Sequence, residues 1–154
     1  SGIWNFTTII AAPEQPVLSS PADSAIEVSI NPALQWAPAA RADSYRVQVA
    51  IDSGFAAGII ADQPGIVSQS FSPSVLQYST DYYWRVQSSN IGGTSPWTQV
   101  FSFTSALAPP SAASLLATPA DNSTWLSLQP MFSWQPVASA SSYQLQVSTA
   151  IFRA

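Results

Sequence analysis

Apolar and polar residues alternate with a period of two along much of this chain. In four segments every second residue is apolar, and the residues between them are polar or, at Tyr83, amphipathic: 34–36, 45–49, 82–86 and 101–103. Such alternation puts apolar side chains on one face of an extended strand, as half-buried antiparallel strands require. Since no segment has a clear helical period, the pattern predicts an all-β chain.

Clusters of turn-forming residues separate these segments, and 13 prolines punctuate the 154 residues. The clusters that we expect to form turns are Asn31-Pro32, 38–43, Asp52-Ser53-Gly54, Gln63-Pro64-Gly65 and 90–95. Short strands with turn signals at this spacing predict a β-sandwich or a β-barrel.

The stretch from Leu18 to Val49 is repeated, without a gap, from Leu116 to Val147. The offset is 98 residues, and 14 of 32 aligned positions are identical. Residues 4–8 are similar to residues 101–105 at an offset of 97. Self-similarity at a fixed period indicates a tandem array. Arrays of small domains more often provide length, spacing or a repeated binding face than chemistry.

The repeat divides the chain into one complete and two partial modules. We expect residues 1–9 to be the final strand of a preceding module, residues 10–108 a complete module with flanking linkers, and residues 109–154 the first three strands of a following module. The Ala- and Pro-rich stretches Ile10–Pro16 and Ala106–Ala113 predict semi-rigid linkers. Because a partial sandwich leaves an apolar face uncovered, we expect other parts of the same polypeptide or an adjacent subunit to cover it.

The run from Leu76 to Asn90 resembles a fibronectin type III domain. The pattern of that family is Leu-x-Pro-Gly-Thr-x-Tyr-x-x-x-Val, and Leu76, Thr80, Tyr82 and Val86 match it. Tyr78 and Ser79 replace the usual Pro-Gly, so the turn there is expected to differ. The resemblance covers residues 13–105 fully, residues 109–154 as the first three strands, and residues 1–8 as a final strand.

The resemblance implies an immunoglobulin-like sandwich of two sheets, one of strands A, B and E, the other of strands C, C′, F and G. It implies that the hydroxyl of Tyr82 bonds to the backbone just upstream, as in the tyrosine corner of sandwich domains. The inner faces would carry Leu34, Trp36, Tyr45, Val47, Val49, Phe71, Tyr82, Trp84, Val86, Phe101 and Phe103.

The composition excludes several classes of function. Charged residues make up 8% of the chain and the net charge is −4, so no basic patch exists to neutralise the phosphates of a nucleic acid. The absence of cysteine excludes disulfides and thiolate metal sites. No run of about 18 apolar residues occurs, so the sequence predicts no membrane insertion.

Catalytic residues and cofactors are not predicted. The chain has no histidine, cysteine or lysine, so the usual general bases and activated nucleophiles are missing. Asp43, Asp52, Asp62 and Asp81 fall in loops or strand ends of a small sandwich. Calcium needs several convergent oxygen ligands, and Asp52-Ser53-Gly54 offers one carboxylate, so we expect a turn there and no metal site. These features predict a protein that is not an enzyme.

The outer face of strands C and F is a candidate contact surface. Arg46 and Gln48 should lie across from Tyr83, Arg85 and Gln87. In the structural interpretation, which we favour, these residues form a cation–π or stacking ladder that stabilises the sheet. In the functional interpretation, Arg46, Tyr83 and Arg85 contact a partner, because Tyr and Arg are enriched at interface hot spots.

Trp125 is a further candidate contact residue. It occupies the position of Glu27 in the complete repeat, which should point outward. An exposed tryptophan indicates a partner, such as a neighbouring module, another subunit or a sugar ring. The alternative is that Trp125 covers the open end of its own partial module.

Together these features favour a structural or adhesive module of an extracellular or cell-surface array, such as a bacterial adhesin, sheath or filament subunit. Low charge allows close lateral packing, and strands of one chain could complete the partial module of the next in a homopolymer. The alternative is a spacer or accessory module of a secreted carbohydrate-active enzyme, with a polysaccharide as partner. A receptor ectodomain is less favoured because cysteines are absent. A sandwich hosts many roles, so the fold does not decide among these functions.

Overall fold

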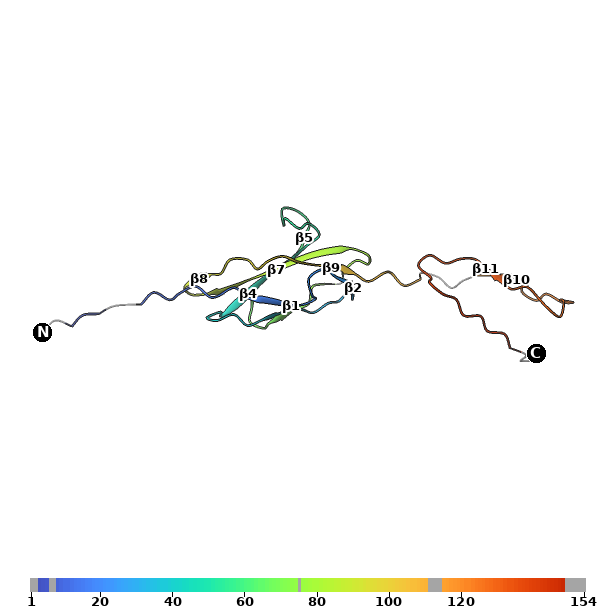
Figure 1. The fold of residues 1–154 in the computed structure, drawn as a ribbon, viewed down its shortest axis with the longest axis horizontal. Coiled ribbons are helices and arrows are strands. Elements are labelled where there is room, and N and C mark those ends of the chain that lie inside the picture. The colour runs from blue at the N-terminus through green and yellow to red at the C-terminus, as the bar shows by residue number, and fades with distance from the viewer. Residues whose placement is uncertain (1–2, 6–7, 75, 111–114, 149–154) are drawn as a thin grey trace. The chain divides into compact units, whose positions relative to one another are not determined.

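The computed structural model describes residues 3–5, 8–74, 76–110 and 115–148. The chain divides into two compact units, residues 1–107 and residues 108–154 (Figure 1). Every regular element among the described residues is a β-strand, as the alternation predicts. In the first unit the strands are β1 Val17–Ser20, β2 Ala25–Val28, β3 Leu34–Ala37, β4 Ser44–Ala50, β5 Ile59–Ile66, β6 Ser70–Phe71, β7 Asp81–Asn90, β8 Gly93–Thr94 and β9 Phe101–Ser105.

These strands form two sheets with a shared core. The smaller sheet is antiparallel and has the order β1-β3-β6. The larger sheet has the order β2-β9-β7-β4-β5, with β8 paired to β7. The smaller sheet corresponds to strands A, B and E and the larger one to strands C, C′, F and G, so the predicted sandwich is confirmed. The strand β2 was not predicted. It pairs in parallel with β9, so the chain passes from the smaller sheet at β1 to the larger sheet at β2.

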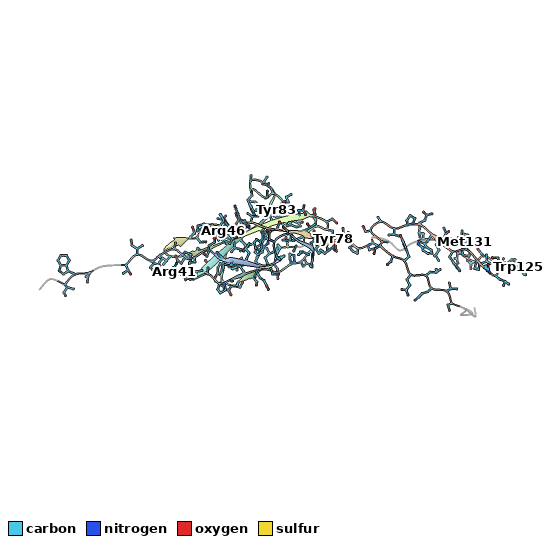
Figure 2. The ribbon with its side chains drawn as sticks, in the orientation of Figure 1. Arg41, Arg46, Tyr78, Tyr83, Trp125 and Met131 are labelled. Atoms are coloured by element: carbon cyan, nitrogen blue, oxygen red, sulfur yellow. The ribbon has the colours of Figure 1, made fainter. Side chains whose placement is uncertain are left out.

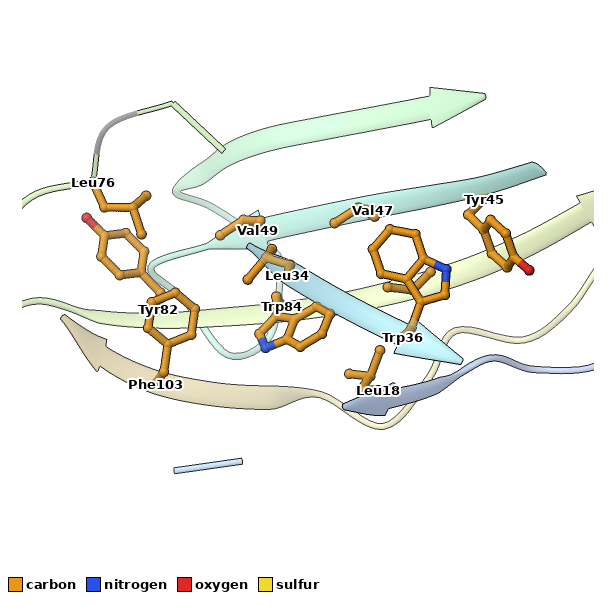
Figure 3. Packing of buried hydrophobic residues seen from close by; sticks show 11 residues of the cluster. Leu18, Leu34, Trp36, Tyr45, Val47, Val49, Leu76, Tyr82, Trp84 and Phe103 are labelled. Atoms are coloured by element: carbon orange, nitrogen blue, oxygen red, sulfur yellow. The ribbon is translucent and has the colours of Figure 1, made fainter. Parts of the chain in front are cut away.

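The core lies between the inner faces of the two sheets (Figure 3). The buried cluster consists of Leu18, Leu34, Trp36, Tyr45, Val47, Val49, Leu76, Tyr82, Trp84, Val86 and Phe103. It includes every predicted inner-face residue except Phe71 and Phe101, which are partly buried against it. Burial of one such side chain contributes about 1.5–3 kcal/mol. Trp84, which is fully buried, meets the ring of Phe101 edge-on with the ring centroids 6.1 Å apart.

The tyrosine corner is present. The hydroxyl oxygen of Tyr82 accepts a hydrogen bond from the backbone N–H of Gln77 at 2.9 Å, which confirms the predicted role of this residue. The turn before it differs from the Pro-Gly turn of the family. Ser79 adopts a left-handed φ of 49°, and the hydroxyl of Thr80 donates to the carbonyl of Tyr78 at 2.8 Å.

The prediction of one turn in the first unit is wrong. Gln63-Pro64-Gly65, predicted as a turn, lies inside β5. A proline is tolerated there because β5 is an edge strand that pairs with β4 alone, so the missing N–H leaves no ladder partner unsatisfied. The closing strand, β9, begins at Phe101. The segment before it also follows β7, because the backbone N–H of Thr98 donates to the carbonyl of Val86 at 2.9 Å and the Thr98 hydroxyl accepts the N–H of Val86 at 3.0 Å.

The N-terminal residues form no strand where the structure describes them. Of the predicted final strand, residues 3–5 and 8–9 are exposed and unpaired, and residues 1–2 and 6–7 lie outside the described residues. The predicted linker Ile10–Pro16 is wrong in its second part, because Pro13 and Pro16 are buried against the first unit. The other predicted linker, Ala106–Ala113, is described up to residue 110 and contains no strand.

The second unit has a two-stranded antiparallel sheet of β10, Leu116–Thr118, and β11, Ser133–Trp134. Its local geometry repeats that of the first unit at an offset of 98 residues. Leu116 lies opposite Trp134, as Leu18 lies opposite Trp36. Left-handed φ angles recur at equivalent positions, at Ser24 and Asn122, Glu27 and Trp125, and Arg41 and Ser139.

The third predicted strand of the second unit does not form. Residues 141–148 have no strand assignment, although the Tyr143 hydroxyl still accepts the N–H of Val137 at 2.8 Å. The reason is the lack of pairing partners. In the first unit the equivalent strand, β4, is held between β5 and β7, and the described residues of the second unit include no counterpart of either.

Replacing the corner tyrosine should destabilise the first unit. We expect Tyr82→Phe to lower the free energy of unfolding by about 0.5–1.5 kcal/mol, because the N–H of Gln77 loses its hydrogen-bond partner. Urea denaturation followed by tryptophan fluorescence measures this change. Tyr78→Phe is the matched control, since that ring is exposed beside the same turn. Equal urea midpoints for the two variants would contradict the assigned role.

Candidate functional site

The outer face of the larger sheet carries the polar residues of β4 and β7. The antiparallel register places Arg46 opposite Gln87 and Gln48 opposite Arg85. Tyr83 lies further toward the start of β7. The predicted juxtaposition of these residues is therefore confirmed, and Arg46 and Tyr83 lie on one side of the first unit (Figure 2).

Three strands contribute to one hydrogen-bonded network on this face. The guanidinium of Arg46 binds both carboxylate oxygens of Asp62 on β5, at 2.7 and 2.6 Å. The amide of Gln48 donates to Asp62 at 3.0 Å, and its oxygen accepts from Arg85 at 3.0 and 2.7 Å. Gln48 thus links the ion pair to the second arginine, and its own side chain is buried by this contact.

Arg85 is stacked between two aromatic rings. Its guanidinium carbon lies 4.0 Å from the ring centroid of Phe55 and 4.5 Å from that of Trp97. Arg46 also lies over Trp97, at 5.8 Å. The predicted cation–π ladder therefore exists, but its rings are Phe55 and Trp97 and not Tyr83. Such contacts contribute about 0.5–2 kcal/mol each, depending on desolvation.

The network shifts the pKa values of its members in the directions that its geometry requires. The hydrogen bonds from Arg46 hold the pKa of Asp62 below its ordinary value, with a smaller contribution from Gln48. The same hydrogen bond raises the pKa of Arg46. Burial, followed by the neighbouring charge of Arg46, lowers the pKa of Arg85.

The loop after β4 covers this face and supplies Phe55. Asp52 organises the loop, because its carboxylate accepts the backbone N–H of Ala56 at 3.0 Å. Hydrogen bonds from the N–H groups of Ala56 and Gly54 lower the pKa of Asp52. The predicted turn at Asp52-Ser53-Gly54 is thus present. Among the described residues, no group of three or more His, Cys, Asp or Glu side chains is placed to hold a metal ion.

A small hollow of about 230 Å³ lies beside Tyr83 on the same sheet. Its lining consists of Ser24, Asp81, Tyr83, Ser102, Phe103 and Thr104. The Thr104 hydroxyl donates to one carboxylate oxygen of Asp81 at 2.6 Å, which orients that carboxylate. Tyr83 is flanked across the sheet by the small residues Ala50 and Ser102, so neither neighbouring strand covers its ring.

The second unit exposes the apolar face that the first unit buries. Val47 and Val49 on β4 are 0% exposed, whereas their counterparts Leu145 and Val147 are 43% and 70% exposed. Further exposed apolar side chains of this unit are Leu115, Leu116, Leu126, Leu128, Met131 and Tyr143. An apolar surface of this extent marks an interaction site or an aggregation liability.

Trp125 is fully exposed, at 100% of its accessible area (Figure 2). The interpretation in which it covers the open end of its own unit is therefore wrong. Its backbone has the left-handed conformation of Glu27, with φ of 59° and 56° respectively, which directs both side chains outward.

The three predicted contact residues of the first unit do not form one site. Arg46 and Arg85 are joined in the network, Tyr83 lines the separate hollow on the same sheet, and Trp125 belongs to the second unit. Phe55 and Trp97 were not predicted to be partners of Arg85. Phe55 is the one large apolar residue in the loop 52–58, and this isolated position could have indicated that its side chain packs against the sheet.

The described residues contain no helix of the length and apolar character needed to cross a membrane.

Acid should weaken the network through Asp62. The unfolded carboxyl has a pKa of about 3.9, and the folded pKa is lower. Its contribution to stability is therefore present above the unfolded pKa and is lost as the pH falls through the folded pKa. We expect Asp62→Asn to lower the urea midpoint at neutral pH and to differ progressively less from the unchanged protein below pH of about 4. A difference between the two proteins that does not vary with pH would contradict this assignment.

Comparison with known proteins finds similarity to solved structures alone. No family model and no curated protein matches the sequence. Similar solved structures include FN3tt, at 18% identity and a TM-score of 0.46 over 62% of this chain and 98% of that one. They also include an Fn3-like protein from Clostridium thermocellum, at 21% identity and a TM-score of 0.46 over 64% and 95% of the two chains. The first unit is an all-β sandwich of two sheets, the arrangement that the resemblance to fibronectin type III domains implies.

Proposed function

We propose that this chain is a non-enzymatic structural module of an extracellular repeat protein, part of a surface filament, sheath or adhesin. In this proposal neighbouring polypeptides of the same kind assemble through β-strand and module contacts. The observation that carries it is the exposed apolar face of the second unit. The extracellular placement rests on the repeat, the low charge and the resemblance.

The first unit indicates what such a face needs. There, β4 is paired in its sheet with β7, which places Val47 beside Val86 and Val49 beside Trp84 in the core cluster, and β9 follows β7 in the same sheet. Leu145 and Val147 have the same alternation, but among the described residues no strand pairs with their segment, and both side chains are exposed. Each such side chain contributes about 1.5–3 kcal/mol when it becomes fully buried. The segment therefore fits strands that alternate as β7 and β9 do, supplied by a neighbour and paired beside it in the same sheet.

The surface chemistry of the first unit supports close packing between copies. The outward positions of the smaller sheet, for example Val17, Gln35, Ala37 and Ser70, carry no charge. On the larger sheet, two of the four arginines of the chain are held within the network. Copies can therefore approach one another without strong repulsion.

Self-association through the second unit can be tested with charged substitutions on its two faces. We expect Leu145→Asp combined with Val147→Asp to weaken association by at least about tenfold, because burying an unpaired carboxylate is costly. Sedimentation velocity over a range of protein concentrations measures the association.

The matched control is Gln144→Asp combined with Gln146→Asp, which places the same charge on the opposite face of the same segment. Its association should stay close to that of the unchanged chain. A chain that is monomeric at every concentration, or an equal effect of the two double variants, would count against assembly through this face.

The hollow beside Tyr83 favours a second candidate function, that of an accessory module which contacts a polysaccharide. The hollow combines an aromatic ring, a carboxylate oriented by Thr104, and the hydroxyls of Ser24 and Ser102. A sugar offers an apolar C–H face for the ring and hydroxyls for the polar groups. Its volume of about 230 Å³ suits a small group such as one sugar residue.

Affinity electrophoresis in gels containing soluble β-glucan or xylan tests this second candidate. We expect the chain to be retarded and Tyr83→Ala to weaken binding by about tenfold or more, because the stacking platform is removed. Tyr78→Ala, which removes an exposed tyrosine outside the hollow, is the control. Retardation by neither polysaccharide, or equal retardation of both variants, would exclude this role for the hollow.

A further inference from the structure

The segment Ala11–Pro16, which leads into the first strand, is held along one end of the first unit. The backbone N–H of Glu14 donates to the carbonyl of Ala40 at 3.0 Å. The Ser88 hydroxyl of β7 donates to the carbonyl of Glu14 at 2.6 Å. With Pro13 and Pro16 buried, this leading segment is part of the module and not a free tether.

Two turns of the module supply side chains that hold the leading segment. Asn90, at the end of β7, donates from its amide nitrogen to the carbonyls of Ala11 and Arg41, at 3.0 and 2.8 Å. An amide group has two N–H donors, and both are used here. Arg41, in the turn between β3 and β4, donates to the carbonyl of Ala12 at 3.3 Å. It also approaches the carboxylate of Glu14 at 3.4 Å.

Gly92 provides the space that the leading segment needs. A Cβ atom at this position would lie 2.2 Å from the carbonyl oxygen of Ile10, a distance at which backbone would have to move. The side-chain oxygen of Asn90 accepts the N–H of Gly92 at 2.7 Å, which fixes the turn in this position. Arg41, Asn90 and Gly92 thus form a clamp on the leading segment.

The chain is also held where it leaves the module. The N–H of Ala106 donates to the carbonyl of Val28 at 2.8 Å, and the N–H of Ser79 donates to the carbonyl of Ala106 at 3.0 Å. The next residue, Leu107, is 64% exposed. The backbone hydrogen bonds that hold the outgoing chain to the module therefore end at Ala106.

We infer that the clamp is an interface for the connector between consecutive modules, and that it leaves almost no free chain there. At the offset of 98 residues, Pro109 and Pro110 correspond to Ala11 and Ala12. The clamp uses the carbonyl groups of these positions, which proline retains, and proline favours an extended chain. In an array of complete modules, only Leu107 and the residue after it would lie between the two attachments.

This inference rests on the proposed function in so far as it concerns an array, whereas the clamp itself lies within one module. Its consequence is stiffness. A connector this short cannot act as a flexible tether, so each module would fix the direction in which its predecessor enters.

The clamp can be tested in the whole chain by distance measurement between two spin labels. The chain has no cysteine, so Ile9→Cys and Tyr78→Cys place labels just before the leading segment and at the opposite end of the module without side reactions. We expect a narrow distance distribution. Asn90→Ala combined with Arg41→Ala should broaden it about twofold or more, because the released segment samples many conformations.

Asn31→Ala, at an exposed asparagine outside the clamp, should leave the distribution narrow. Gly92→Ala is a second, independent release of the segment, and near-ultraviolet circular dichroism checks that each variant retains its core. A broad distance distribution in the labelled chain without clamp substitutions would overturn the inference. Distance distributions of equal width in all folded variants would also overturn it. Both labels lie in one module, so this measurement does not depend on self-association. A narrow distance distribution in a chain that does not self-associate would contradict the proposed assembly and support the clamp.

Discussion

The antiparallel pairing of β4 and β7 is the constraint on which the rest of the first unit depends. Its continuous register, from Ser44 opposite Ser89 to Ala50 opposite Tyr83, decides the face of every side chain on both strands. One face supplies Val47, Val49 and Trp84 to the core, and the other supplies the polar network. A shift of one residue would exchange the two faces and bury arginine. The core and the network therefore stabilise the same register.

The sequence predicted features that depend on residues close together in the chain. Alternation located β3, β4, β7 and β9 and most of the core, and the pattern around Tyr82 located the tyrosine corner. Features that depend on distant contacts were missed. Nothing local to Pro64 indicates that its strand lies at an edge, where its missing N–H is harmless. Nothing local to Phe55 or Trp97 indicates that their rings meet on Arg85, because two separate loops bring them together.

The second unit shows which structural features depend on nearby residues and which depend on distant contacts. Its turns, its short β10–β11 pair and the Trp134–Tyr143 ring contact repeat those of the first unit. These features form although the apolar face is uncovered, so short-range sequence is enough to specify them. Residues 141–148, which share the alternation of β4, do not form a strand. Strand formation there requires a hydrogen-bonding neighbour, since an extended segment satisfies none of its own backbone groups.

The turn around Asn90 and Gly92 has a consequence for how this module tolerates sequence change. Hairpin turns at the ends of a sandwich are ordinarily places where insertions are accepted. Here the turn after β7 touches the incoming chain so closely that an added residue would displace it. The segment after β5 is different, because Val67 and its neighbours are exposed. Length variation should therefore accumulate between β5 and β6, while the turn after β7 keeps its length and its glycine.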